Sequence, residues 1–76
     1  MWIRSQNRMQ LQDVNRFVIE QFEIGIYIVG NGCTLGIYST KEKALKVLDQ
    51  IQYNMEPFEH EPTMVFQMPT DEDVEV

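Results

Sequence analysis

The run EIGIYIVGNGCTLGIYS, residues 23–39, constrains the fold of this chain more than any other part of the sequence. Two halves rich in β-forming residues flank the dipeptide Asn31-Gly32. This dipeptide favours a type I′ turn, because both of its residues readily take the positive φ angles that the turn requires. The run therefore predicts a β-hairpin with a two-residue turn.

The turn also predicts which residues of the two strands lie opposite each other. Four aliphatic residues then share one face, which we expect to be the core face: Ile26, Ile28, Leu35 and Ile37. On the other face two glycines each lie opposite a tyrosine, Gly36 across from Tyr27 and Gly25 across from Tyr38. Aromatic rings stabilise strand glycines in this way, so the predicted register is internally consistent.

The next run, STKEKALKVLDQIQYNM, residues 39–55, predicts a helix. Ser39 with Glu42 three residues later fits a capping box, and Thr40 is the alternative cap. Pro57 ends the helix. One apolar stripe follows helical spacing: Ala44, Val47, Leu48, Ile51 and Met55. We expect this stripe to pack on the aliphatic face of the hairpin.

The flanking sequence predicts further strands. The runs MWIRSQ (1–6) and RFVIEQ (16–21) are typical of strands, and a short strand around Met9–Leu11 could lie between them. TMVFQM (63–68) stands between two prolines and predicts a last strand at a sheet edge. We therefore expect an α+β fold: a small, mostly antiparallel sheet of about four to five strands, in the order β-β-β-β-α-β, with one helix packed on one face.

The charge is distributed unevenly along the chain, although the net formal charge is −6. All six Lys and Arg residues lie at or before Lys46, together with four of the twelve acidic residues. The mildly basic body could therefore hold an anionic ligand despite the acidic total. We expect residues 1–69 to form a single domain, and residues 70–76 to be an acidic, disordered tail.

One helix covers only one face of a sheet, so the sequence predicts that the opposite face stays uncovered. We place Tyr27, Val29, Tyr38 and Trp2 on that face. An exposed apolar patch of about 400 Å² is unfavourable for a small isolated domain. The pattern therefore predicts a homo-oligomer, most simply a twofold dimer.

Other features argue against several classes of protein. A single cysteine, Cys33, excludes an intramolecular disulfide framework and suits a reducing compartment. The sequence has no run of about 18 apolar residues and no basic, apolar leader, so we expect no membrane partner. It has no long basic stripe, so we do not expect binding to duplex nucleic acid. These features predict a cytoplasmic protein.

The sequence has no constellation typical of an enzyme. Cys33 and His60 could form a nucleophile pair, but we expect a structural cysteine and a solvated histidine. The acidic segment EPFEHEP (56–62) lacks the spacing of metal ligands, and the hairpin accounts for GNGCTLG (30–36) better than a phosphate-binding loop does. We therefore predict no catalytic residue, no cofactor and no metal site.

The N-terminal run MWIRSQ contributes most of the candidate ligand-binding residues, because strand alternation places its even-numbered side chains on one face. An aromatic ring stacks on a base and a guanidinium binds a phosphate, so we expect a ligand platform formed by Trp2, Arg4, Gln6, Tyr27 and Tyr38. The alternative is structural. In that case Trp2 packs on the sheet, and Arg4 either stacks on an aromatic ring or pairs with Glu20 or Glu23.

Three runs, MWIRSQ, LGIYSTKEKALKVLDQIQ and VFQMP, resemble a family of short uncharacterised proteins encoded by phages and prophages of Gram-positive bacteria. The resemblance extends from Met1 to Pro69. It implies a phage setting in the host bacterial cytoplasm, where small non-enzymatic proteins often inhibit host defence or sequester its signals. The family offers no catalytic motif to transfer to this chain.

Three functions remain open at this point. The first is a homo-oligomeric sponge that sequesters a small anionic, nucleotide-like ligand of host defence. The second is an inhibitor of a host protein, in which the acidic C-terminal part mimics nucleic acid. The third is a structural or accessory phage module without a small ligand. We favour the first function, because the candidate ligand residues would form the binding site of such a sponge.

Overall fold

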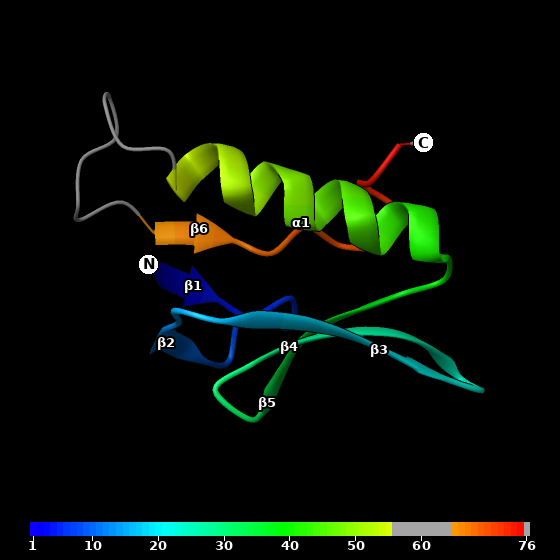
Figure 1. Ribbon diagram of the computed structural model, residues 1–76, viewed down its shortest axis with the longest axis horizontal. Helices are drawn as coiled ribbons and strands as arrows, with labels where there is room; N and C mark the ends of the chain where they lie inside the picture. Colours follow the sequence, from blue (N-terminus) through cyan, green and yellow to red (C-terminus); the bar gives the residue numbers. More distant parts are fainter. Residues whose placement is uncertain (56–64, 76) are drawn as a thin grey trace.

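The computed structural model describes residues 1–55 and 65–75. Over these residues it has six strands and one helix, so the predicted α+β class with a single helix is confirmed. The elements follow one another as β1 (Trp2–Arg4), β2 (Leu11–Asp13), β3 (Phe17–Phe22), β4 (Gly25–Gly30), β5 (Cys33–Tyr38), α1 (Lys41–Met55) and β6 (Val65–Gln67). Figure 1 shows α1 along the upper side of the molecule and the β3-β4-β5 sheet along the lower side.

The strands divide into two sheets of three, where the sequence predicted one sheet. The first has the order β2-β1-β6, and the second has the order β3-β4-β5. β1 pairs antiparallel with β2 and parallel with β6, which lies at the sheet edge as predicted. The division occurs after β2, at Val14. Its backbone N–H donates to the Met1 carbonyl at 2.8 Å and its side chain is fully buried, so Val14 anchors the chain to the core before β3 begins.

The hairpin of β4 and β5 has the predicted two-residue turn. Asn31 and Gly32 have φ angles of 53° and 77°, both in the left-handed region that a type I′ turn requires. Next to the turn the register is also as predicted, with Gly30 opposite Cys33 and Val29 opposite Thr34. The local sequence therefore determines both the turn and the first two pairs of the ladder.

Beyond those pairs the predicted register is wrong by one residue. The ladder shifts between Val29 and Ile28, so that Ile28 lies opposite Gly36 and Leu35 is an extra, unpaired residue. An extra residue in one strand moves every later side chain of that strand to the other face. Tyr38 consequently lies in the core, whereas Ile37 is 42% exposed.

The predicted pairing of glycines with tyrosines across the hairpin is therefore not present. Tyr27 lies opposite Ile37, and Tyr38 lies opposite Ile26. The Tyr38 ring instead packs over Gly36 of its own strand. A Cβ atom at Gly36 would lie 3.0 Å from the nearest atoms of that ring.

The helix begins as one of the two alternatives predicted. The Thr40 hydroxyl accepts a hydrogen bond from the Lys43 backbone N–H at 3.1 Å, which makes Thr40 the N-cap. Of the predicted apolar stripe, Ala44, Val47 and Ile51 are buried, and the helix packs against β4 and β5. Within the described part of the chain, no helix is long and apolar enough to cross a lipid bilayer.

A single core joins all these elements. Its buried apolar side chains come from both sheets, from the helix and from the segment after β6: Ile3, Val14, Ile28, Leu35, Tyr38, Ala44, Val47, Ile51, Met68 and Val74. The core therefore includes a residue beyond Pro69, where the sequence predicted that the domain ends.

The expectation of a disordered tail does not hold for residues 70–75, which fold back onto the start of the helix. The Asp71 carboxylate accepts hydrogen bonds from the Ser39 backbone N–H at 2.8 Å and from the Ser39 hydroxyl at 3.1 Å. The Lys43 ammonium donates to the Asp71 carbonyl at 2.9 Å, and Val74 is only 4% exposed. Acidic residues are stabilised near a helix N-terminus, and this explains why such a charged segment is ordered here.

Candidate ligand surface

The five candidate ligand residues do not form one platform. Trp2 and Arg4 lie on the outer side of the β2-β1-β6 sheet, and Tyr27 lies on the outer side of the other sheet. Gln6 and Tyr38 make internal hydrogen bonds. The structure therefore brings together only the first two of the five.

Trp2 and Arg4 are exposed because β1 alternates as the sequence predicted. Ile3 between them is fully buried, whereas Trp2 is 42% exposed and Arg4 is also exposed. The residues opposite them on the neighbouring strands complete a surface that we call the β1 face: Trp2, Arg4, Leu11, Asp13, Val65 and Gln67. This surface contains one guanidinium, one carboxylate and several apolar side chains.

Arg4 makes one hydrogen bond, from its Nε to the Arg8 carbonyl at 3.2 Å. The predicted alternative, an ion pair with Glu20 or Glu23, is not formed, since Arg4 has no ion pair with any residue in the described part of the chain. Its two terminal nitrogens likewise have no acceptor among those residues. The guanidinium is thus oriented by one contact and retains donors for a ligand.

The turn between β1 and β2 holds the Arg8 carbonyl in place. Asn7 accepts a hydrogen bond on its side-chain oxygen from the Ser5 hydroxyl at 2.7 Å, and the Arg8 N–H donates to the Ser5 carbonyl at 2.8 Å. Arg8 has a φ angle of 68°, an uncommon conformation for a residue other than glycine. Sequence reasoning missed this turn, although asparagine is one of the residues that favour turns.

Asp13 is the acidic group of the β1 face. Its carboxylate lies 2.8 Å from the N-terminal ammonium of Met1, and it is more than half exposed. This ion pair offsets part of the negative charge beside Trp2. An anionic ligand bound at Arg4 is therefore repelled less by the Asp13 carboxylate than the sequence alone would indicate.

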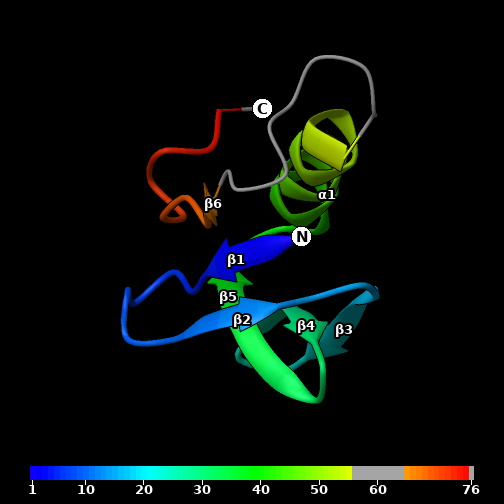
Figure 2. The same ribbon diagram turned by 90° about the vertical axis from the view of Figure 1, so that its left-hand side faces the viewer.

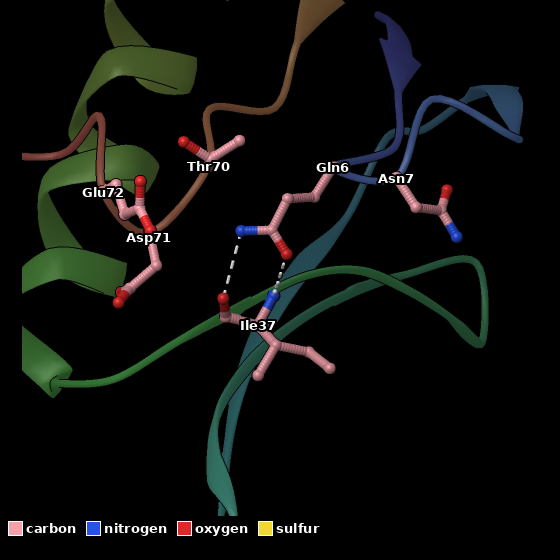
Figure 3. A pocket seen from close by; sticks show the side chains of 6 residues that line it. All are labelled: Gln6, Asn7, Ile37, Thr70, Asp71 and Glu72. Carbon is pink, nitrogen blue, oxygen red and sulfur yellow. Dashed lines mark hydrogen bonds between the residues drawn. The ribbon is translucent and has the colours of Figure 1, made fainter.

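Gln6 connects the two sheets instead of facing solvent. Its Oε1 accepts from the Ile37 N–H at 3.0 Å, and its Nε2 donates to the Ile37 carbonyl at 3.0 Å and to the Pro69 carbonyl at 3.2 Å. Figure 3 shows the two bonds to Ile37. Both amide N–H donors of Gln6 are therefore used within the protein.

Tyr38 is also internal. Its side chain is 1% exposed and its hydroxyl donates to the Pro69 carbonyl at 2.7 Å. Burial, together with the negative charge of Asp71, raises the pKa of the Tyr38 hydroxyl, so this group remains a neutral donor. The bulge at Leu35 is the reason that this tyrosine points into the core, away from the surface where the sequence placed it.

Tyr27 belongs to an apolar surface on the outer side of the β3-β4-β5 sheet. We call this surface the open face: Val18, Phe22, Tyr27, Val29 and Ile37. Tyr27 packs against Phe22 in an edge-to-face geometry, with ring centroids 4.8 Å apart, and Val18, Phe22 and Ile37 are each more than 40% exposed. The predicted uncovered face thus exists, with Tyr27 and Val29 on it but without Tyr38 or Trp2.

A groove of about 490 Å³ lies beside Gln6 and is lined by Gln6, Asn7, Ile37, Thr70, Asp71 and Glu72 (Figure 3). Hydrogen bonds from Ser39, first of all from its backbone N–H, lower the pKa of Asp71, and the nearby Lys43 lowers it further. The groove therefore carries carboxylate charge at neutral pH. An anionic ligand would be repelled there, so the β1 face is the better candidate.

Metal and thiol chemistry have little support among the described residues. Among residues 1–55 and 65–75 there is no group of three or more His, Cys, Asp or Glu side chains that could hold a metal ion. Cys33 is half-buried at the start of β5. His60 and the rest of the segment 56–62 lie outside the described residues.

No protein-family model matches the chain, and neither the curated proteins nor the solved structures compared with it gave a match.

Proposed function

We propose that this protein is a small, non-enzymatic binding protein that holds a small anionic, nucleotide-like ligand on its β1 face. Trp2 would stack on the base and Arg4 would bind the phosphate. The observation that supports this most directly is the pair itself: an exposed indole and a guanidinium with free donors, two residues apart on one strand. That spacing is about 7 Å, so one ligand of nucleotide size spans both groups.

A protein that binds such a ligand without altering it acts by lowering the free concentration of the ligand. In the phage setting that the sequence resemblance implies, the ligand would be a nucleotide signal of host defence. Gln6 and Tyr38 are not part of this proposed site, because their polar atoms already bond within the fold. Tyr27 is not part of it either, since it belongs to the other sheet.

The alternative in which the acidic C-terminal part mimics nucleic acid has less support. Such mimicry needs carboxylates that are free to meet a basic partner. Asp71 instead bonds to Ser39 and lies 3.6 Å from the Lys43 ammonium, and the segment around it is part of the folded core through Val74. The β1 face is therefore the surface on which we base the proposal.

Titration calorimetry against a panel of cyclic and linear nucleotides tests the proposal. We expect one member of the panel to bind the wild-type protein and to quench the fluorescence of Trp2, which is the only tryptophan. Arg4→Ala should weaken binding about 10- to 100-fold, as expected for the loss of about 1.5–3 kcal/mol from a hydrogen bond to a charged group. Trp2→Ala should weaken it by a similar factor through lost stacking.

Lys41→Ala is the matched control, because it removes one positive charge from an exposed position on the helix, away from the β1 face. We expect this variant to bind as the wild type does. Absence of binding by the wild type to every nucleotide would contradict the proposal. Equal weakening by Lys41→Ala and Arg4→Ala would also contradict it, because it would show only a general effect of charge.

A further inference from the structure

The two edges of the β3-β4-β5 sheet differ in how their backbone groups are satisfied. At the β5 edge, the side-chain amide of Gln6 bonds to both the N–H and the carbonyl of Ile37. The Gln6 backbone N–H also donates to the Leu35 carbonyl at 2.7 Å. Gln6 thus closes this edge as a neighbouring strand would.

Among the described residues, none covers the β3 edge in this way. The turns at both ends of β4 contain two residues each, so Phe22 and Gly25 form one closing pair and Gly30 and Cys33 the other. A closing pair exchanges backbone hydrogen bonds, and along an antiparallel ladder hydrogen-bonded pairs alternate with pairs that are not hydrogen-bonded. The backbone N–H and carbonyl groups of Phe17, Ile19 and Gln21 therefore point away from β4. No residue of the described part of the chain donates to these groups or accepts from them, and Figure 2 shows β3 at the outer side of its sheet.

β3 also lacks the devices that usually protect an edge strand. Its sequence, FVIEQF, is six residues long and contains neither proline nor lysine, and Glu20 is its only charged residue. An unprotected edge of this kind is a template for pairing with another strand. A strand from a second copy of this chain would supply the missing backbone partners.

The charges beside this edge are arranged so that a second copy fits in one register. Alternation places Arg16 next to Val18 on the outer side of the sheet, and both residues line one cavity of about 280 Å³ there. Glu20 follows on the same side, two residues further along the chain. The pattern Arg16-x-Val18-x-Glu20 therefore has opposite charges at equal distances from Val18.

We propose that two copies of this chain pair along β3, antiparallel and about a twofold axis at Val18, to form one six-stranded sheet. Val18 then lies opposite Val18 of the second copy, and each Arg16 lies opposite Glu20 of the other copy. Phe17 exchanges backbone hydrogen bonds with Ile19 of the second copy, and these are two of the residues whose backbone groups point outward. The two open faces then form one continuous apolar surface.

Neighbouring registers fit less well. A twofold axis at Glu20 would set two carboxylates opposite each other, and like charges directly opposite across a ladder are destabilising. An axis at Ile19 would put Glu20 opposite Val18 and leave the charges without direct partners. The charge pattern thus selects the axis at Val18.

Light scattering and sedimentation velocity test this pairing. At a protein concentration of about 100 μM, the wild type should have twice the 9.0 kDa mass of the chain. Glu20→Arg and Arg16→Glu should each give a monomer, since each sets like charges opposite each other. The double variant should dimerise again because it restores the pairs with their signs exchanged.

Asp49→Arg is the matched control: it makes the same change of charge at an exposed helix position and should remain dimeric. A monomeric wild type, a dimeric Glu20→Arg variant or a monomeric double variant would each overturn the proposal.

Amide hydrogen exchange gives a test that needs no variant. The Phe17 and Ile19 amides should be protected at high protein concentration and lose protection on dilution, and equal exchange at both concentrations would overturn the pairing.

This pairing is independent of the proposed ligand, because the β1 face belongs to the other sheet. The wild type should dimerise without any nucleotide, and Arg4→Ala should remain dimeric. A dimer that binds no nucleotide would contradict only the proposed function. A monomer that binds one would contradict only the pairing.

Discussion

At the scale of single residues, the Pro69 carbonyl is a junction between distant parts of the chain. It accepts a hydrogen bond from the Tyr38 hydroxyl at 2.7 Å and another from the Gln6 amide at 3.2 Å. These bonds connect β5 and the segment after β1 to the residues that follow β6. Both side chains were candidates for ligand binding, and in the structure both stabilise the fold.

We expect Tyr38→Phe to lower the free energy of unfolding by about 1 kcal/mol, because it removes one buried hydrogen-bond donor and keeps the ring. Thermal denaturation should show a fall in Tm of about 4–8 °C for a domain of this size. Tyr27→Phe is the control, since the Tyr27 hydroxyl has no partner among the described residues. An unchanged Tm for Tyr38→Phe would contradict the role of the Pro69 contact.

Tyr38→Glu should prevent folding, since it would bury a charge.

Gln6→Ala should be more costly, because it removes three side-chain hydrogen bonds. At about 0.5–1.5 kcal/mol each, the expected loss of stability is about 2–4 kcal/mol. Calorimetric binding, expressed per folded molecule, should be unchanged if Gln6 acts only in the fold. A stable Gln6→Ala variant with weakened nucleotide binding would instead return Gln6 to the ligand site.

At the scale of elements, the start of α1 and the segment 70–75 form one unit. Thr40 caps the helix directly, and Asp71 bonds to Ser39 just before it. Lys43 reaches back to the Asp71 carbonyl, and Lys46 donates to the Glu75 carbonyl. Two helical lysines therefore hold the segment 70–75 against the helix.

The hydrogen bonds to Asp71 make its contribution to stability depend on pH. They lower its pKa in the folded state below the ordinary value of 3.8. A lowered folded pKa means that this stabilisation is present above the unfolded value and is lost as the pH falls through the folded value. Asp71→Asn should therefore lower Tm at neutral pH and have a smaller effect near pH 2. Tm measured against pH checks this, with Asp73→Asn as the control; a gap that stays constant with pH would contradict it.

Truncation after Pro69 should destabilise the protein, in contrast to what a disordered tail would predict. Burial of a valine side chain contributes about 1.5–3 kcal/mol, and the truncation removes Val74 from the core. A loss of about 2 kcal/mol corresponds to a fall in Tm of about 8–16 °C. The double variant Glu72→Gln, Glu75→Gln removes tail charge without removing the contacts of Asp71 and Val74, so it should keep the wild-type Tm. A truncated protein with an unchanged Tm would show that the docked segment adds no stability.

At the scale of the whole molecule, two small sheets and one helix share one core. Ile3 comes from the first sheet, Ile28 from the second and Val47 from the helix, and all three are fully buried. Neither three-stranded sheet has a core of its own in this arrangement. The molecule should therefore unfold as one cooperative unit.

Urea denaturation followed by two probes tests this cooperativity. Fluorescence of Trp2 reports on the β2-β1-β6 sheet, whereas far-ultraviolet circular dichroism reports mainly on α1. The two transitions should have the same midpoint and the same slope. Ile3→Ala should lower the free energy of unfolding by about 2–5 kcal/mol, because it leaves a cavity where the layers meet. Both transitions should then shift together to lower urea concentration. Separate midpoints would show that the sheets are independent units.

The sequence by itself determined the features that depend on neighbours along the chain. The Asn31-Gly32 turn follows from the φ angles that these two residues tolerate, and the helix from an apolar stripe with helical spacing. The alternation that exposes Trp2 and Arg4 likewise needs only the period of a strand. Each of these depends on contacts within a few residues, and such contacts can be inferred from local composition.

Only the tertiary structure decided the features that depend on distant partners. At the bulge, the Leu35 carbonyl accepts a hydrogen bond from the Gln6 backbone N–H. The buried Tyr38 hydroxyl donates to the carbonyl of Pro69, which lies 31 residues away in the sequence. The docking of Val74 likewise depends on a core built from both sheets. Each of these arrangements is selected by the summed packing and hydrogen bonding of segments that meet only in the folded chain, and no local pattern carries that information.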